Sequence, residues 1–410
     1  MEIKAGYKQT DVGIIPNDWD VKRLGEIGEA IIGLTYKPTD VRSDGVLVLR
    51  SSNIQQDRLR FDDNVFVDMD ISEKLMVRTG DVLICVRNGS RELIGKCAQL
   101  DERTQGMTFG AFMTVFRSPY NNYVSHQFQS QIIKKQIHEH LGATINQITN
   151  KSLNSFVIPL PPTKAEQEAI AEALSDADAL IEALEGLIAK KRQVKQGAMQ
   201  ELLRPKKNWV EKKLGNTAVL KARIGWQGLT TKEYLDTGTY YLITGTEFKN
   251  GYIDWDDCHY VNASRYKQDK NIQVREHDVL VTKDGTIGKV ALITDLPKPA
   301  TLNSGVFVIR PIEDAFNPEF FYYLLCTSVF TEFLNQLSAG STINHLYQKD
   351  FVNFVYKTPS TLPEQTAIAE ILSDMDAEIA ALEGKLSKAR QVKQGMMSVL
   401  LTGRIRLNHD

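Results

Sequence analysis

The sequence predicts an α+β protein in which two strand-rich α/β domains are separated by two long antiparallel coiled-coil helices, giving a pseudo-twofold chain. Three observations lead to this prediction. One long segment occurs twice at a spacing of 198 residues, the segments before the two copies resemble each other, and both contain short β-branched runs between glycine turns. A chain of 410 residues is also two to three times the usual domain length, so two cores are expected.

The repeated segment runs from Glu166 to Leu203 and again from Glu364 to Leu401, and 26 of its 38 positions are identical. Prolines precede each copy and none lies inside, which is typical of one uninterrupted helix. Apolar residues recur three and four positions apart, as in a coiled-coil seam. The residues expected to pair the helices are Ile170, Leu174, Ile181, Leu184 and Ile188 in the first copy, and Ile368, Leu372, Met375, Ile379, Leu382 and Leu386 in the second.

The charges of the two copies predict how they pair. The first half of each copy is acidic and the second half is basic. Antiparallel pairing sets the acidic half of one helix beside the basic half of the other, whereas parallel pairing would align like charges. A helix of about 40 residues is roughly 60 Å long, too long for one small core to cover, and the other copy is an available partner. The alternative is two unrelated solvated helices whose end charges only follow the helix dipole.

The segments before the two helices also match each other. Trp19 to Gly25 resembles Trp209 to Gly215, and Gly142 to Asn146 resembles Gly340 to Asn344 at the same 198-residue offset. Runs rich in Val, Ile and Leu predict strands in both segments, and short helices are expected at 122–140 and 317–337. We therefore expect a first globular domain over 1–160, a helix within 161–204, a second globular domain over 205–358 and a second helix within 359–404.

The composition excludes several classes of protein. With 49 basic and 51 acidic residues, the formal net charge of −2 offers no general attraction to nucleic acid or anionic lipid, so DNA affinity requires a locally basic face or a basic partner. The four cysteines form no CxxC pair, which argues against a disulfide framework and against a zinc site. The chain has neither a signal-peptide pattern nor an apolar run of about 20 residues, so a cytoplasmic protein is expected.

Two different globular domains, here called heads, on a rigid shared scaffold suit the recognition of two DNA half-sites. Several motifs support this interpretation: the run Pro159-Leu-Pro-Pro162, the segment Ala165-Glu-Gln-Glu-Ala-Ile170 with its echo Pro363-Glu-Gln-Thr-Ala-Ile368, the Arg-Gln-Val-Lys-Gln-Gly helix ends, and the opening Thr10 to Trp19. Together with the alternation of unlike domains and repeated helices, they resemble the specificity subunit of type I restriction-modification systems. The resemblance covers nearly the whole chain.

The resemblance implies a function and a set of partners. Each globular unit would be a target recognition domain that reads one half of a split sequence in double-stranded DNA. The helices would set the gap and dock two modification subunits, which bind S-adenosylmethionine and methylate adenine. Restriction subunits would add ATP- and Mg-dependent translocation and cleavage in defence against phage. This chain is then expected to be non-catalytic and to bind no cofactor and no metal.

Two sequence motifs that approach catalytic patterns have simpler interpretations. Asn317-Pro-Glu-Phe320 lacks the second proline of an adenine methyltransferase motif, and we interpret Asn317 as a helix N-cap followed by Pro318 at the first helical position. Gly89 to Lys96 resembles a P-loop, but it has one residue too many between its glycines, and Cys97 stands where Ser or Thr would bind magnesium.

Polar residues on glycine-rich loops at strand ends are the candidates for base contacts. In the first head they are Arg50, Ser52, Asn53, Arg87, Asn88, Ser90, Arg91, Thr144, Asn146 and Gln147. In the second head they are Thr244, Thr246, Lys283, Thr286, Asn303, Ser304, Thr342, Asn344 and His345. Lys96 and Lys289 are better suited to phosphate contacts, because a lysine ammonium lacks the planar, two-pronged geometry of an arginine guanidinium.

Each of these candidates has a structural alternative. Asn88-Gly89 and Asp284-Gly285 are also ordinary hairpin turns, and Thr144 and Thr342 are also ordinary capping residues. The near-zero net charge further predicts weak DNA binding by the isolated chain and tight binding only with the modification subunits. The competing functional hypotheses are a coiled-coil scaffold with two heads that bind ligands other than DNA, and an enzyme with its own nuclease or methyltransferase activity.

Overall fold

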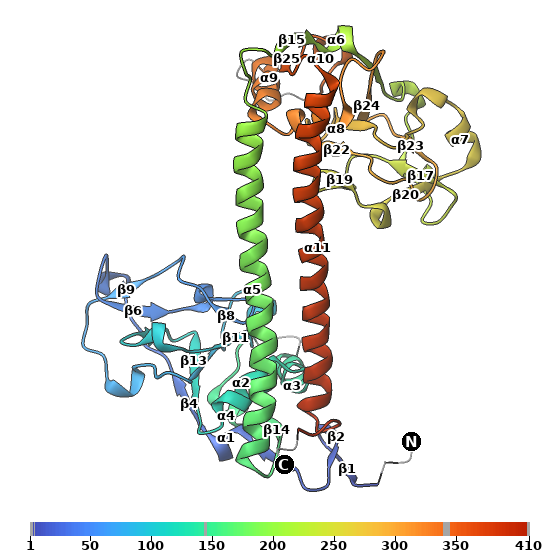
Figure 1. Ribbon diagram of the computed structural model, residues 1–410. Helices are drawn as coiled ribbons and strands as arrows, with labels where there is room; N and C mark the ends of the chain where they lie inside the picture. The colour runs from blue at the N-terminus through green and yellow to red at the C-terminus, as the bar shows by residue number, and fades with distance from the viewer. Residues whose placement is uncertain (1–2, 4, 143–145, 339–344, 408–410) are drawn as a thin grey trace. The chain divides into compact units, whose positions relative to one another are not determined.

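The computed structural model describes residues 3, 5–142, 146–338 and 345–407 of the chain (Figure 1). It contains two compact units. Unit 1 comprises Met1–Glu185 together with Gly384–Asp410, and unit 2 comprises Gly186–Glu383. The boundary passes through both long helices, α5 (Lys164–Leu202) and α11 (Leu362–Leu400), so each unit holds half of each helix. The two helices have the same length and lie 198 residues apart, as the repeat predicts.

In unit 1 the first half of α5 packs antiparallel to the second half of α11. Lys393 Nζ lies 2.7 Å from Asp178 Oδ1, and Arg390 Nη2 lies 2.7 Å from Glu185 Oε1. As the residue number rises along α5, the number of its partner falls along α11, which defines the opposite chain direction. The antiparallel prediction is therefore confirmed in this unit.

Unit 2 repeats the same ion pairs with the roles of the helices exchanged. Lys195 pairs with Asp376, and Arg192 Nη2 lies 2.5 Å from Glu383 Oε1. Each of these four residues lies 198 positions from its counterpart in unit 1. The acidic and basic halves of the repeated segment thus pair with each other in both units.

The predicted seam residues lie mostly out of solvent. Ile170, Leu174, Ile181, Ile188, Ile368, Leu372, Ile379 and Leu382 are buried, whereas Leu184, Met375 and Leu386 are half-buried.

Two sheets form the globular part of unit 1. The first has the order β11-β10-β13-β4 and the second the order β12-β6-β9-β5, in which β12 runs parallel to β6. Smaller antiparallel pairs are β1-β2, β14-β3 and β7-β8. The strand bounds are β1 Tyr7–Thr10, β2 Gly13–Pro16, β3 Asp20–Arg23, β4 Glu29–Ile32, β5 Val41–Arg42, β6 Val46–Leu49, β7 Ile54–Gln55, β8 Arg58–Leu59, β9 Phe66–Val67, β10 Val82–Cys85, β11 Cys97–Gln99, β12 Thr108–Phe109, β13 Met113–Arg117 and β14 Val157–Leu160.

Unit 2 repeats the order of the first sheet, but its second sheet has three strands and no counterpart of β5. Its first sheet has the order β22-β21-β24-β16, its second has the order β20-β17-β23 with β17 parallel to β23, and its small pairs are β15-β25 and β18-β19. The strand bounds are β15 Val210–Lys213, β16 Ala218–Lys221, β17 Tyr240–Ile243, β18 Phe248–Lys249, β19 Tyr252–Ile253, β20 His259–Val261, β21 Val279–Thr282, β22 Val290–Leu292, β23 Ala300–Leu302, β24 Val306–Pro311 and β25 Val355–Thr358.

Strand alternation separates two large hydrophobic clusters in each unit. In β10, Val82 and Ile84 face the cluster that contains residues of the long helices, and Leu83 and Cys85 face the cluster between the two sheets. This period of two is why a strand with all four residues buried still separates two cores. In β21, Val279 and Val281 likewise face the helices while Leu280 faces the second sheet.

The short helices differ in one respect from the prediction. The single helices expected at 122–140 and 317–337 are each two helices, α2 (Asn121–Gln129) with α3 (Gln131–Leu141), and α8 (Pro318–Leu325) with α9 (Ser328–Ser338). Ser130 breaks the first because its extended backbone lets its hydroxyl cap Ile133 N. Asn317 caps α8 as expected, accepting from Phe320 N at 2.8 Å. The remaining helices are α1 Leu24–Ile27, α4 Asn150–Ser155, α6 Leu214–Thr217, α7 Ala263–Lys267 and α10 Gln348–Phe351.

Candidate nucleic-acid interface

In unit 2 the predicted loops meet where strands of both sheets end. The parallel strands β17 and β23 end at Ile243 and Leu302, and β21 ends at Thr282. The loops that follow these three strands border a polar groove of about 670 Å³. Its lining includes six predicted residues, Thr244, Thr246, Thr286, Lys289, Asn303 and Ser304, together with Thr231, Tyr234, Asp236, His259 and Asp284.

A buried carboxylate shapes the first of these loops. Glu247 is fully buried and accepts hydrogen bonds from Thr244 N at 3.0 Å and from Gly245 N at 2.9 Å. The hydroxyls of Thr244 and Thr246 also donate to it. Gly245 has a φ of +102°, which a residue with a side chain would adopt only with strain. Thr246 is left exposed on the rim, where its oxygen can still accept a hydrogen bond.

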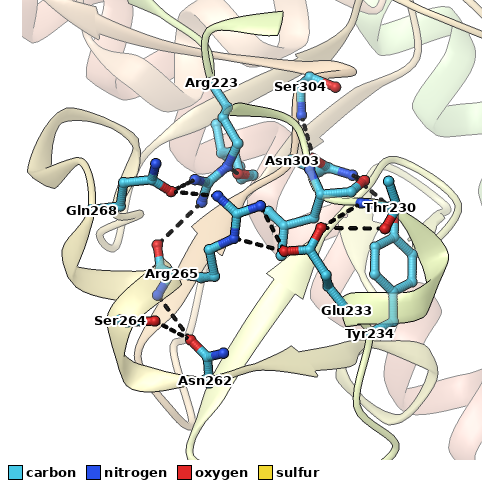
Figure 2. A network of polar contacts seen from close by, with 12 residues as sticks. Arg223, Thr230, Glu233, Tyr234, Asn262, Ser264, Arg265, Gln268, Asn303 and Ser304 are labelled. Carbon is cyan, nitrogen blue, oxygen red and sulfur yellow. Dashed lines mark hydrogen bonds and ion pairs between the residues drawn. The ribbon is translucent and has the colours of Figure 1, made fainter. Parts of the chain in front are cut away.

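Asn303 anchors the groove wall, and it is almost wholly buried. Its side chain is 7% exposed, its Oδ1 accepts from Leu229 N at 3.0 Å, and its Nδ2 donates to Tyr234 Oη at 2.8 Å. Figure 2 shows Asn303 between Tyr234 and Ser304. Its amide is engaged with a loop about 70 residues earlier in the chain, which supports a role in holding the groove wall, and base reading by Asn303 stays a prediction.

An ion pair and a buried arginine brace the segments beside the groove. Arg265 holds Glu233 through two hydrogen bonds of 2.9 and 2.6 Å, and Thr230 N also donates to Glu233 (Figure 2). Arg223 is 1% exposed and donates to Leu302 O at 2.9 Å and to Gln268 Oε1 at 3.1 Å. Since its partners are neutral, burial lowers the pKa of Arg223.

Asp284, in the loop after β21, borders the groove and is paired with a histidine. His345 Nδ1 pairs with Asp284, and its ring lies 4.4 Å from the ring of Tyr347. Lys283 is half-buried over the ring of Phe307, at 5.3 Å from its centroid. Thr286 and Lys289 are exposed, as surface contacts require.

In unit 1 the corresponding strand ends carry the first set of candidates, and Asn53 is the clearest correction. It is fully buried, its Oδ1 accepts from Arg50 N, and its Nδ2 donates to Arg60 O at 3.0 Å and to Asn64 Oδ1 at 3.2 Å. Because Asn53 is fully buried and its amide is held inside the loop, it is not positioned to contact a base.

Arg50 and Ser52, in the same loop, are half-buried. Arg50 pairs with Asp63 at 2.9 Å, and the hydroxyl oxygen of Ser52 is buried.

The loop after β10 combines turn and surface residues. Asn88 Oδ1 accepts from Ser90 N at 3.0 Å and its Nδ2 donates to Ser51 Oγ, so Asn88 supports the turn as the structural alternative proposed. Ser90 is exposed and Arg91 half-buried. Lys96 Nζ donates to Ile54 O at 2.9 Å, which fastens the loop to β7.

Arg87 and Phe112 form an exposed pair, of which only Arg87 was predicted from the sequence. The guanidinium carbon of Arg87 lies 5.1 Å from the centroid of the Phe112 ring, and the Phe112 side chain is 57% exposed. Phe112 was missed because an aromatic residue beside a strand looks like core. Its position directly after the Gly110-Ala111 turn was the available signal.

The remaining predicted residues are placed as follows. Asn146 and Gln147 are exposed, and Gln147 forms an isolated β-bridge with Arg87. Thr144, Thr342 and Asn344 lie outside the described residues.

Two kinds of feature are absent from the described ranges. Across 5–142, 146–338 and 345–407, no cluster of three His, Cys, Asp or Glu side chains has the arrangement of a metal site. No described helix combines the length and the apolar character needed to cross a bilayer.

The family comparison covers both units. The family described as type I restriction modification DNA specificity domain matches residues 16–191 and again residues 206–391. The chain belongs to this family. Each match contains one globular part and most of the long helix that follows it, so the specificity domain is present twice.

Full-length relatives of this specificity-domain chain occur in Methanocaldococcus jannaschii. A putative type I restriction enzyme MjaX specificity subunit is 26% identical, with 98% of this chain and 97% of the relative covered. The type I restriction enzyme MjaVIII specificity subunit is 24% identical over 96% and 95% of the two chains. In fold, the chain resembles a type I restriction-modification S subunit from M. genitalium, with a TM-score of 0.64 and 14% identity over 100% of this chain and 99% of that one.

Proposed function

We propose that this chain is the DNA specificity subunit of a type I restriction-modification complex. Each globular part would read one half of a bipartite target in double-stranded DNA. The single observation that supports this best is the double match to the specificity domain, in which both copies share the strand order of their first sheet but carry different loops at the corresponding strand ends. Shared scaffolds with unlike loops are what two separate sequence specificities require.

The long helices are proposed to set the unread gap and to dock two modification subunits, with restriction subunits joining the complex. Under this proposal the chain itself is non-catalytic and binds no cofactor. S-adenosylmethionine, ATP and Mg would be held by the partner subunits. The support is the family match and the full-length similarity to specificity subunits.

The competing scaffold function, with heads for a peptide or glycan, gains no support from the groove. Its lining of threonines, a lysine and carboxylates offers many hydrogen-bonding groups. Such a lining fits the polar edges of bases better than an apolar peptide anchor.

Methylation mapping tests the proposal. Modification subunits are co-expressed with and without this chain in a host that lacks its own adenine methylation, and the methylated adenines are read across the genome. We expect methylation at one split motif, and only when the chain is present. Methylation that is independent of the chain, or that follows no motif, would contradict the proposal.

A further inference from the structure

The two units present opposite charges at one equivalent position of the candidate interface. The equivalence follows from backbone hydrogen bonds. Ile148 N donates to Val86 O at 2.8 Å in unit 1, and Leu346 N donates to Lys283 O at 2.9 Å in unit 2. Ile148 and Leu346 are both buried and lie 198 residues apart.

The neighbouring residues are therefore counterparts. Arg87 and Gln147 in unit 1 correspond to Asp284 and His345 in unit 2. A second hydrogen bond extends the match, because Val86 N donates to Phe112 O at 3.0 Å while Lys283 N donates to Gly305 O at 2.8 Å. Phe112 thus corresponds to Gly305.

In unit 1 this position carries a cation held by an aromatic ring. Arg87 is exposed, and its guanidinium lies over Phe112. Within the described ranges, no carboxylate comes within ion-pair distance of Arg87. A guanidinium group that is oriented by an aromatic ring and not paired with a carboxylate is suited to a bidentate contact with the O6 and N7 acceptors of guanine.

In unit 2 the same position carries an anion in an open groove. Asp284 is paired with His345, and Asp284 borders the groove beside Gly305. A Cβ added at Gly305 would lie 3.7 Å from Asp284 Oδ2, so a side chain there would stand beside Asp284 as Phe112 stands beside Arg87. A carboxylate accepts hydrogen bonds from the exocyclic amino group of cytosine or adenine and repels the acceptors of guanine.

We infer that Arg87 with Phe112, and Asp284 with His345, are specificity-determining pairs at matching positions of the two units. Unit 1 requires guanine at its position, and unit 2 requires a base with a major-groove amino group. This inference rests on the proposed function and assigns base chemistry to it.

The test exchanges Arg87 and Gln147 with their counterparts Asp284 and His345 in the complex with modification subunits, with methylation mapping as the readout. One variant combines Arg87→Asp with Gln147→His, and the reciprocal variant combines Asp284→Arg with His345→Gln. We expect the first to lower the preference for guanine at one position of one half-site by about tenfold or more and to leave the other half-site unchanged. The reciprocal variant should raise guanine preference in the other half-site.

A charge-matched control is Lys135→Asp, an exposed cation on α3 that should leave the motif unaltered. If Arg87→Asp abolishes methylation, Arg87→Ala decides the matter, and we expect it to accept any base at that position. An unchanged base preference in Arg87→Ala, or changes in the same half-site for both exchanges, would overturn the inference. A parent complex without a motif would instead be a failure of the proposed function.

Discussion

Lys393 Nζ lies 2.7 Å from Asp178 Oδ1 and 3.0 Å from Gln129 Oε1, so one ammonium group joins α11 to α5 and to α2. Only 13% of the Lys393 side chain is exposed. Its counterpart Lys195 pairs with Asp376, which also accepts from Tyr323 Oη at 2.8 Å. In both units a half-buried ion pair therefore fastens the two helices and the globular part together.

Removing Lys393 should loosen unit 1 locally. We expect Lys393→Ala to destabilise the contact between α5 and α11 by about 1–2 kcal/mol, because it leaves the Asp178 carboxylate partly buried without its cation. Hydrogen exchange in peptides covering 170–185 and 386–400 measures this loss. The matched control is Lys388→Ala, an exposed lysine of the same helix, which should change exchange little. Equal effects of the two variants would contradict the role given to Lys393.

His126 should make unit 1 sensitive to acid. Burial, with Lys393 nearby, lowers the pKa of His126 to about 4, below its ordinary 6.5. Between pH 6.5 and 4, His126 binds a proton in the unfolded chain but not in the folded chain. The free energy of unfolding therefore falls by up to about 3 kcal/mol as the pH is lowered through this range. We expect His126→Gln, which can still reach Ser175, to flatten this dependence in denaturant melts. The exposed His138→Gln should retain it.

Asn303 and Lys289 line one groove, but their substitutions should have different effects. Asn303→Ala leaves Leu229 N and Tyr234 Oη without their partner, so unit 2 should lose about 1–3 kcal/mol of stability. Lys289→Ala should leave stability within about 0.5 kcal/mol and weaken DNA binding by the complex equally across sequences. Melting curves and binding titrations separate the two. If the Asn303→Ala chain is stable and its recognition motif is altered, the result would support base reading by Asn303.

The helices should act as a spacer. We expect one heptad inserted between Leu187 and Ala189, with a matching heptad near Leu386, to lengthen the unread gap and to leave both half-sites unaltered. Seven helical residues add about 10 Å, so a gap longer by about one to three base pairs is expected. Methylation mapping reads gap and half-sites together. Changed half-site bases would contradict the spacer role.

The isolated chain should bind DNA weakly. Its net charge of −2 provides little affinity through counterion release, so tight binding should require the modification subunits. Titrations of the chain alone and of the complex at several salt concentrations test this. Salt-insensitive nanomolar binding by the chain alone would contradict it.

The sequence by itself determined the features that depend on local periodicity and on repetition. The heptad spacing predicted both helices, the acidic and basic halves predicted their antiparallel direction, and the paired motifs around Trp19 and Trp209 predicted two related globular domains. Each of these signals lies within a short stretch of chain or between two copies of one stretch, so no long-range contact was needed to find it.

Only the tertiary structure decided which polar residues are free to act. Asn53 and Asn146 are both asparagines on predicted loops, but Asn53 is buried by hydrogen bonds within its loop and Asn146 is exposed. Asn303 is committed to Tyr234, and the exposed Phe112 is brought beneath Arg87. These outcomes depend on contacts between residues far apart in the chain, whose hydrogen-bond and packing energies leave no trace in local sequence pattern.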